Sequence, residues 1–147
     1  MLIGHILSRK GDHVVTVRPD ASIADALEQL REHNIGALVV RDDAAGAPLL
    51  GVLSERDVVR ALTTLGATTL DQQVADLMTA DPTTCTPRGT VEEVMRVMTD
   101  QRIRHLPVVE GGELRGIVSI GDVVKSRIDE LREEAETLHE YLLSGRS

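Results

Sequence analysis

The sequence predicts a mixed α/β (α+β) fold made of two β-α-β-β-α units that share one core. Three observations support this prediction. The chain contains the same pattern of segments twice, each copy has short apolar runs typical of strands, and each copy has amphipathic stretches that follow a helix-capping signal. A chain of 147 residues is long enough for one compact domain and short for two independent ones. We therefore expect the two copies to pack together as a pseudo-twofold pair.

Three segments of the first copy return in the second. They are a proline-led stretch, a stretch of the form I-x-x-L-x-V and a stretch of the form G-[VI]-[LV]-S-x-x-D. They begin at Pro19, Ile35 and Gly51 in the first copy and at Pro87, Ile103 and Gly116 in the second. A repeat of this length is a structural unit. We predict one repeat over 1–70, a second over 71–128 and a C-terminal helical extension over 129–147.

Each copy is expected to open with a helical turn and a short strand. In the lead-ins, 3–7 and 74–78, apolar residues recur three and four positions apart, which predicts single helical turns. The β-prone stretches 14–17 and 83–85 follow, and a proline comes soon after each. Because proline cannot donate to a sheet ladder, we expect both strands to end there.

A capping signal then begins the first long helix of each copy. Ser22 stands three residues before Asp25, and Thr90 stands three before Glu93, which is the spacing of a capping box. The apolar residues that follow have the i, i+3, i+4, i+7 spacing of a helix with one buried face. They are Ile23, Ala26, Leu27 and Leu30 in the first copy and Val91, Val94, Met95 and Met98 in the second.

Two short apolar runs complete the strands of each copy. The runs are 37–40 with 49–53 in the first copy and 106–109 with 114–118 in the second, and loops rich in Gly, Asp or Pro separate them. This pattern is typical of paired strands. A second helix is expected to begin at Ser54 in the first copy and at Ser119 in the second.

The last predicted helix is longer than one half of the molecule needs. From Val124 onward its apolar residues are spaced 4, 3, 4, 3 and 4 apart, at Ile128, Leu131, Ala135, Leu138 and Leu142. A 3.5-residue period favours packing against a partner helix. From 122 to 143 the helix would be about 33 Å long. We expect it to pack against another protomer and form a homodimer, and the alternative is a helix folded back on its own domain.

Composition excludes several classes of function. The formal charge of −8 and the absence of Phe and Trp disfavour a nucleic-acid partner. The single cysteine, Cys85, rules out an intramolecular disulfide and is typical of a reducing compartment. We expect a cytoplasmic protein with no membrane association, since no secretory pattern and no apolar run of about 20 residues is present.

The sequence does not indicate an enzyme. No serine or cysteine stands with a recognisable base, so no catalytic residue is predicted. His5, His13, His33 and His139 share no spacing with acidic residues that would suggest a zinc site, and no metal is expected.

The polar signature S-x-x-D stands twice between a strand and a helix. It comprises Ser54 with Asp57 in the first copy and Ser119 with Asp122 in the second. One explanation is a simple capping box. Another is a binding site, because a helix N-terminus favours a nearby phosphate and a carboxylate can accept hydrogen bonds from both hydroxyls of a ribose.

The repeated motifs as a set resemble a CBS-domain pair, also called a Bateman module, over roughly 4–125. The resemblance implies that adenosine ligands such as AMP, ADP, ATP, NAD or S-adenosylmethionine bind in clefts between the two copies. It also implies that the module reports their occupancy to a partner or an attached domain.

The resemblance also implies roles for individual residues. Asp57 and Asp122 would each hold a ribose, and Ser54 and Ser119 would meet phosphate. The adenine slot would be lined by the residues just before the leading proline of one copy and by the second strand of the other, and Gly36 and Ala37 are also candidate binding residues. The residues assigned in this way are Thr16, Val17 and Arg18 for the Asp122 cleft and Thr84, Cys85 and Thr86 for the Asp57 cleft.

We expect the two clefts to bind with unequal affinity. The second copy has Arg104 and His105 where the first has Gly36 and Ala37, which would add a cation and a titratable ring to the Asp122 cleft. The first copy has Arg56 inside its signature, where the second has glycine, and an arginine fork suits phosphate. Lys10 could also reach a phosphate.

These expectations give two hypotheses of function. In the first, the chain is a homodimeric sensor of energy or cofactor state that binds AMP, ADP, ATP or NAD and regulates an unidentified protein. In the second, it is a dimerisation or interaction scaffold whose S-x-x-D motifs only cap helices. The ligand, the number of occupied clefts and the orientation of the dimer remain open at this stage.

Overall fold

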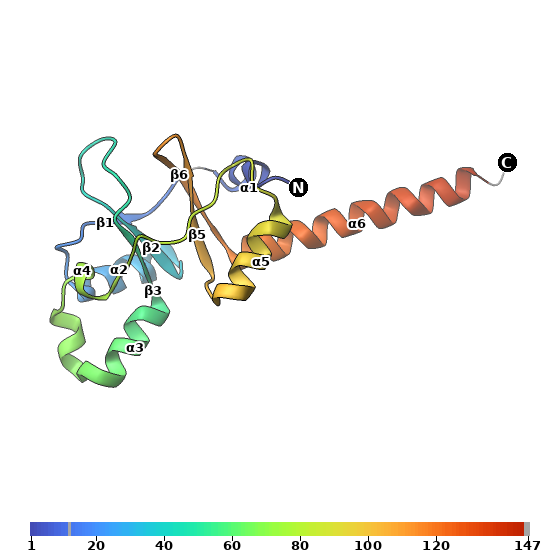
Figure 1. Ribbon diagram of the computed structural model, residues 1–147. Helices are drawn as coiled ribbons and strands as arrows, with labels where there is room; N and C mark the ends of the chain where they lie inside the picture. Colours follow the sequence, from blue (N-terminus) through green and yellow to red (C-terminus); the bar gives the residue numbers. More distant parts are fainter. Residues whose placement is uncertain (12, 146–147) are drawn as a thin grey trace.

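Two β-sheets lie side by side, one in each half of the molecule (Figure 1). The computed structural model describes residues 1–11 and 13–145. The first sheet has the order β1-β2-β3-β4, with β1 parallel to β2 and the other pairs antiparallel. The second is the antiparallel pair β5-β6. The strands are β1 (Thr16–Val17), β2 (Ala37–Val40), β3 (Gly51–Ser54), β4 (Thr79–Ala80), β5 (His105–Glu110) and β6 (Glu113–Ser119).

Within residues 1–11 and 13–145, six α-helices and one 3-10 helix precede, connect or follow these strands. The mixed α/β fold with two β-α-β-β-α repeats and a long last helix is therefore confirmed. The helices are α1 (Ile3–Lys10), α2 (Ile23–His33), α3 (Glu55–Leu65), the 3-10 helix η1 (Gly66–Asp71), α4 (Val74–Leu77), α5 (Val91–Gln101) and α6 (Ile120–Ser144).

The two halves exchange their lead-in helices. Helix α1 begins the chain, but Ile3, Ile6 and Leu7 pack in the core of the second half, with residues of α5, β5 and β6. Helix α4 opens the second copy, but Val74 and Leu77 pack in the core of the first half. Each half is therefore completed by the segment that opens the other copy.

The same backbone hydrogen bonds hold both exchanged helices. The N–H of Ile3 donates to the carbonyl of Gly89 at 2.9 Å, and in the other half the N–H of Val74 donates to Ala21 at 2.8 Å. The next pair repeats the pattern, from Gly4 to Pro87 and from Ala75 to Pro19. Equivalent carbonyl groups in the two halves therefore bind the two exchanged helices, as the predicted pseudo-twofold pairing requires.

The predicted first strands are shorter than expected. In the first copy only Thr16–Val17 of the stretch 14–17 is paired. In the second copy, 83–85 makes a single parallel bridge, between Cys85 and Val108. The reason is that residues 79–80 leave the second half and pair as β4 with β3 of the first sheet, so this stretch of chain passes between the two sheets.

Capping follows the prediction at most helix starts. Thr90 and Glu93 form a reciprocal box at α5, as do the two S-x-x-D pairs at α3 and α6. Ser22 accepts a hydrogen bond from the N–H of Asp25, but the return bond is absent. Residue 22 instead makes a β-bridge with Gln73, next to the exchanged helix α4.

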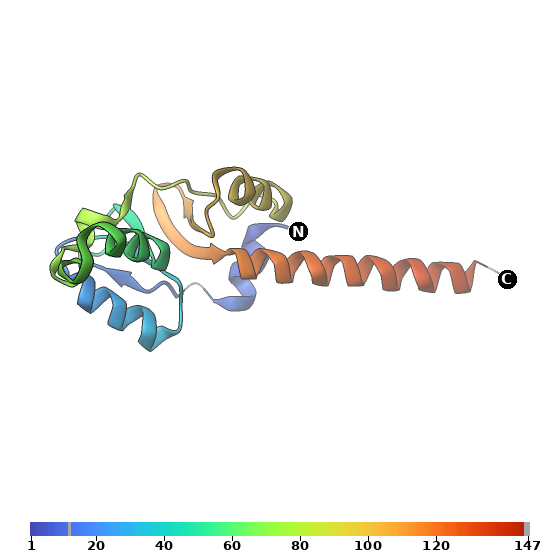
Figure 2. The same ribbon diagram turned by 90° about the horizontal axis from the view of Figure 1, so that it is seen from below.

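Helix α6 projects far beyond the body of the molecule (Figures 1 and 2). Its start packs on the second half through the buried residues Val123 and Ser126. From Leu131 to Gly145 every residue is exposed. The helix is therefore not folded back on its own domain, and residues 146–147 of the predicted extension lie outside the described residues. None of the helices in the described part of the chain is long and apolar enough to cross a membrane.

Candidate functional site

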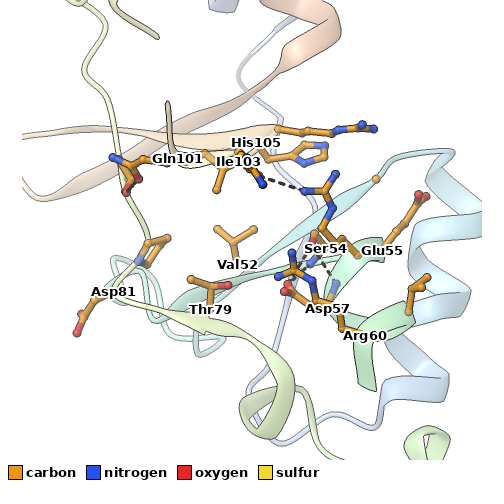
Figure 3. A pocket seen from close by; sticks show the side chains of 17 residues that line it. Val52, Ser54, Glu55, Asp57, Arg60, Thr79, Asp81, Gln101, Ile103 and His105 are labelled. Atoms are coloured by element: carbon orange, nitrogen blue, oxygen red, sulfur yellow. Dashed lines mark hydrogen bonds between the residues drawn. The ribbon is translucent and has the colours of Figure 1, made fainter. Parts of the chain in front are cut away.

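A cavity of about 540 Å³ opens between the two halves, beside the first S-x-x-D signature. Its lining comes from the end of β3 and the start of α3, from the crossing segment at 79–83, and from 101–105 between α5 and β5. In Figure 3, Ser54, Asp57 and Arg60 lie on one side of the cavity and face Gln101, Ile103 and His105 on the other. Both halves of the molecule thus contribute to one site.

The Asp57 carboxylate uses one oxygen for capping. Its Oδ2 atom accepts hydrogen bonds from the Ser54 N–H at 2.8 Å and from the Ser54 hydroxyl at 3.0 Å. The Oδ1 atom has no protein partner within the described residues, and the side chain is only half-buried. The cap therefore leaves one carboxylate oxygen free to accept a hydrogen bond from a ligand.

Two contacts join the sides of the cavity. The Arg56 guanidinium of α3 donates to the carbonyl of Arg102 at 3.2 Å, and Arg102 ends α5 in a left-handed conformation with φ 55°. The ring of His105 lies over Gly36, where an added Cβ would come within 3.2 Å of the His105 Cε1 atom. Glycine at 36 therefore allows the ring to approach the first half closely.

His105 stands between charged groups of both halves. Burial lowers the pKa of its imidazole below the ordinary value of 6.5. The carboxylates of Glu55 and Asp122 act in the opposite direction, while Lys10 and Arg104 add to the lowering. The ring is therefore neutral near pH 7 and can donate or accept a hydrogen bond at the cavity surface.

The second signature has a different environment. Ser119 and Asp122 form the same capping box, but the Lys10 ammonium lies 2.7 Å from Asp122 Oδ2 and also donates to the carbonyl of Ile117 at 3.0 Å. Burial alone would raise the pKa of Asp122, but the hydrogen bonds from Lys10 and Ser119 outweigh it and lower the pKa. This carboxylate already has a cationic partner.

The structure brings together six of the predicted site residues around the cavity. They are Gly36, Ser54, Arg56, Asp57, Arg104 and His105. The others do not line it, namely Thr16, Val17, Arg18, Ala37, Thr84, Cys85, Thr86, Ser119 and Asp122.

The structure places Arg104 and His105 at the Asp57 cavity, whereas the sequence analysis assigned them to the Asp122 cleft. Both residues lie on the Asp57 cavity, opposite α3. The physical reason is that residues 101–105 at the start of β5 turn toward the first half, where Arg102 meets Arg56 and His105 meets Gly36. His105 is also close enough to Asp122 for that carboxylate to raise the pKa of its imidazole.

The expected lining residues of the adenine slot are displaced along the chain. Asp81, Pro82 and Thr83 line the Asp57 cavity in place of 84–86. Cys85 instead pairs with β5 by two backbone hydrogen bonds and packs against the core of the second half. Burial raises the pKa of its thiol to about 11, so the thiol is not reactive near pH 7.

In the first half, the predicted cation Arg18 is already paired. Its guanidinium hydrogen-bonds to Asp20 and Asp43, and these carboxylates raise its pKa. Val17 is buried in β1, and Thr16 beside it is part of the same strand. These three residues therefore have structural partners in this conformation.

Sequence reasoning missed two basic residues of the cavity, Arg60 and Arg102. Arg60 stands four residues after Arg56, one turn along α3, so helical spacing could have placed both on one face. No comparable signal identifies Arg102, because its position depends on the left-handed end of α5. Among the described residues, no cluster of three or more His, Cys, Asp or Glu side chains could hold a metal ion.

Comparison with known proteins gives the same family for both halves. The sequence model of the CBS domain matches residues 3–64 and 74–129. The mitochondrial CBS domain-containing protein CBSX3 of Arabidopsis thaliana is 39% identical over 128 residues, which are 86% of this chain. The chain spans 62% of the length of that plant protein.

Solved structures agree in fold along nearly the whole chain. A CBS-domain containing protein from Agrobacterium tumefaciens has a TM-score of 0.82 and 47% identity, covering 86% of this chain and 99% of its own. The CBS domain pair of protein MJ0100, solved in complex with 5′-methylthioadenosine and S-adenosyl-L-methionine, has a TM-score of 0.76 and 25% identity. That match covers 88% of this chain and 98% of the other.

Proposed function

Because the chain belongs to the CBS-domain family and carries two copies in tandem, we propose that it is a regulatory module that binds an adenine nucleotide beside Asp57. The candidate ligands are AMP, ADP, ATP and NAD. The observation that carries the proposal is the Asp57 carboxylate, which caps α3 with one oxygen and has its other oxygen free at a cavity shared by both halves.

The cavity has the groups that such a ligand needs. The free Asp57 oxygen can accept hydrogen bonds from ribose hydroxyls, and the start of α3 favours a phosphate nearby. Val52, Ile103 and Pro82 supply apolar surface for a base. The adenosine ligands of the related MJ0100 domain pair support the same ligand class here.

A second nucleotide site beside Asp122 is expected to bind more weakly. The Lys10 ammonium occupies the Oδ2 atom of Asp122, and a ribose would compete with this ion pair for the carboxylate. Among the residues that the structure describes, no cation forms an ion pair with Asp57. We therefore propose that the Asp57 site fills first.

Ligand occupancy would act on the relation between the two halves. A nucleotide in the cavity would contact α3 of the first half and residues 101–105 of the second, so binding would favour one arrangement of the halves. We propose that a homodimer formed through α6 transmits this state to a regulated protein. A cytoplasmic location stays a prediction, and one relative is named as mitochondrial.

Calorimetric titration of the full chain with AMP, ATP and NAD tests the proposal. We expect at least one of them to bind, Asp57→Ala to abolish this binding, and Asp122→Ala to retain it. Each substitution should also lower the free energy of unfolding by ~1 kcal/mol, because each removes a helix cap. Absence of binding by every adenosine compound would overturn the proposal.

The scaffold hypothesis is favoured by one observation. Both S-x-x-D pairs form complete capping boxes, so helix capping by itself accounts for both serines and both carboxylates. This hypothesis predicts the same loss of stability in both variants but no ligand binding by the unmodified chain. The calorimetric titration and the unfolding measurements together therefore distinguish the two hypotheses.

A further inference from the structure

Four arginines line the Asp57 cavity of a chain whose formal charge is −8. We propose that this cavity selects ligands with two or more linked phosphate groups over nucleoside monophosphates. The inference rests on the proposed nucleotide site and narrows its ligand class to nucleoside diphosphates, triphosphates and dinucleotides.

The arginines of the cavity have no acidic partner among the described residues. Arg56, Arg60, Arg102 and Arg104 form no ion pair within residues 1–11 and 13–145. Six other basic side chains do, namely Arg9, Lys10, Arg18, Arg31, Arg115 and Arg127. The cavity therefore gathers four guanidinium groups that no carboxylate of the described residues pairs with.

The positions of the arginines suit a chain of phosphates. Arg56 and Arg60 lie one turn apart on α3, and Arg102 and Arg104 lie on the opposite side of the cavity. The hydrogen bond from Arg56 to the Arg102 carbonyl brings the two sides together at one end. A single phosphate can pair with one or two guanidinium forks, whereas two or three linked phosphates can pair with forks from both sides.

Three acidic residues also line the cavity, and they do not cancel this preference. Asp57 is engaged in capping and is the expected ribose acceptor, and Glu55 acts on the His105 ring. Asp81 is exposed, on the segment that crosses between the halves. The four arginines thus outnumber the acids, and His105 is neutral near pH 7.

The repeat provides an internal comparison. The positions that match the four arginines in the other copy are Gly121, Lys125, Asn34 and Gly36, which include one cation. Asn34 ends α2 in the same left-handed conformation in which Arg102 ends α5, with φ 51°. The backbone is therefore equivalent in the two copies, and the arginines are a property of the Asp57 site alone.

The test is a titration series with adenosine, AMP, ADP, ATP and inorganic triphosphate. It uses the full chain at low salt without divalent cations, which would mask the phosphate charge. We expect affinity to rise about tenfold from AMP to ADP and again to ATP, since each added phosphate can form charge-assisted hydrogen bonds. The ratio of the affinity for ATP to the affinity for AMP should fall as the salt concentration is raised.

Substitutions on both sides of the cavity test whether the arginines cause the preference for ATP over AMP. Arg60→Gln and Arg104→Gln should each lower ATP affinity about tenfold and change AMP affinity much less. Arg96→Gln is the matched control, because Arg96 is an exposed arginine of α5 that has no ion pair among the described residues and lies outside the cavity. Thermal unfolding of each variant shows whether the fold is retained.

The outcomes distinguish this inference from the proposed function. Equal affinities for AMP and ATP, or an unchanged ratio in both cavity variants, overturn the inference and leave nucleotide binding intact. Binding of inorganic triphosphate as tightly as ATP would show that the adenosine is not recognised, which overturns the proposed function. No binding of any compound overturns both.

Discussion

Asp57 and Asp122 hold the same position in the two copies, but their neighbours differ in charge. Both cap a helix through Oδ2 and a serine. Asp122 also pairs with Lys10, whose ammonium additionally donates to a backbone carbonyl. A difference in one neighbouring residue can therefore make two equivalent carboxylates unequal as ligand acceptors.

The Lys10→Met variant tests the effect of this neighbour. We expect it to increase nucleotide affinity at the Asp122 site, so that calorimetry finds a second equivalent of ligand per chain. The fold should be retained, because a partly exposed ion pair contributes only about 0–1 kcal/mol. If Lys10 instead binds a phosphate, as the sequence also allowed, the same substitution would weaken binding, and the prediction would be wrong.

His105 is expected to make stability depend on pH. Its pKa is lowered by burial, so the unfolded chain binds the proton more readily than the folded one. The stabilising contribution is complete above the ordinary pKa of 6.5 and is lost as pH falls from 6.5 toward the folded pKa.

Urea unfolding of the wild-type chain and of His105→Gln between pH 8 and pH 5 measures this dependence. The free energy of unfolding of the wild type should decrease relative to the variant below pH 6.5. Parallel curves would show that the ring is not buried as described. Glu55, Asp122, Lys10 and Arg104 are common to both proteins, so their own titration affects both curves.

At the scale of elements, local patterns predicted most of the secondary structure. The stripes of α2 and α5 and the capping residues Thr90, Ser54 and Ser119 depend on neighbours in sequence, and all of them function as predicted. The exchange of α1 and α4 could not be predicted in this way, because an amphipathic turn does not specify which core buries it.

Local sequence patterns also do not specify tertiary packing at the candidate site, so they predicted only some of its residues. The S-x-x-D signature of the first copy and Arg56 could be found from the sequence, since the motif places them at one helix start. Which side of the molecule Arg104 and His105 face depends on how the halves pack. A residue's type and spacing predict its chemistry, whereas its partners across the cavity come from tertiary packing.

Two equivalent glycines lie where another segment of the chain packs closely on a strand, β4 on β3 at Gly51 and α1 on β6 at Gly116. A Cβ at Gly51 would lie 2.7 Å from the carbonyl oxygen of Thr79, which is backbone of β4. A Cβ at the equivalent Gly116 would lie 2.7 Å from Cδ2 of Leu7, the end of a flexible side chain of α1. The backbone of β4 cannot move away as easily as a leucine side chain.

We therefore expect Gly51→Ala to destabilise the protein by ~1–3 kcal/mol and Gly116→Ala by less. Chemical unfolding of both variants gives the comparison. Gly121→Ala is the control, because its Cβ would be 3.6 Å from the nearest atom, Ser119 Oγ, and alanine favours the helix. Equal losses at 51 and 116 would contradict the proposed role of the β4 backbone.

At the scale of the whole molecule, the exchange makes the halves mutually dependent. Neither core is complete without the lead-in helix that the other half's chain supplies. The cavity lies at the junction of these halves, so a ligand bound there would contact both of them. This arrangement suits a module whose signal is the relative position of its halves.

At the scale of the whole molecule, the exposed apolar residues of helix α6 support the proposed homodimer. The apolar residues that recur about every 3.5 positions from Val124 to Leu142 form a seam along the helix. This seam is exposed, with Leu131 at 47%, Leu138 at 59% and Leu142 at 55% of full exposure. An isolated helical segment of this length is only marginally stable in water. The 3.5-residue spacing of the seam favours a second copy of the same helix as its cover.

Light scattering tests this arrangement directly. We expect the full chain to be a dimer. A chain truncated after Arg127, or one that carries Leu138→Glu, should be a monomer. The glutamate would remove an apolar contact from the interface between the two α6 helices and place a negative charge on each of them. Leu143→Glu is the matched control, because Leu143 is equally exposed, at 60%, but lies outside the 3.5-residue seam. A truncated chain that remains dimeric would remove α6 from the interface and leave other exposed apolar residues, such as Val59 and Leu62 of α3, to form it.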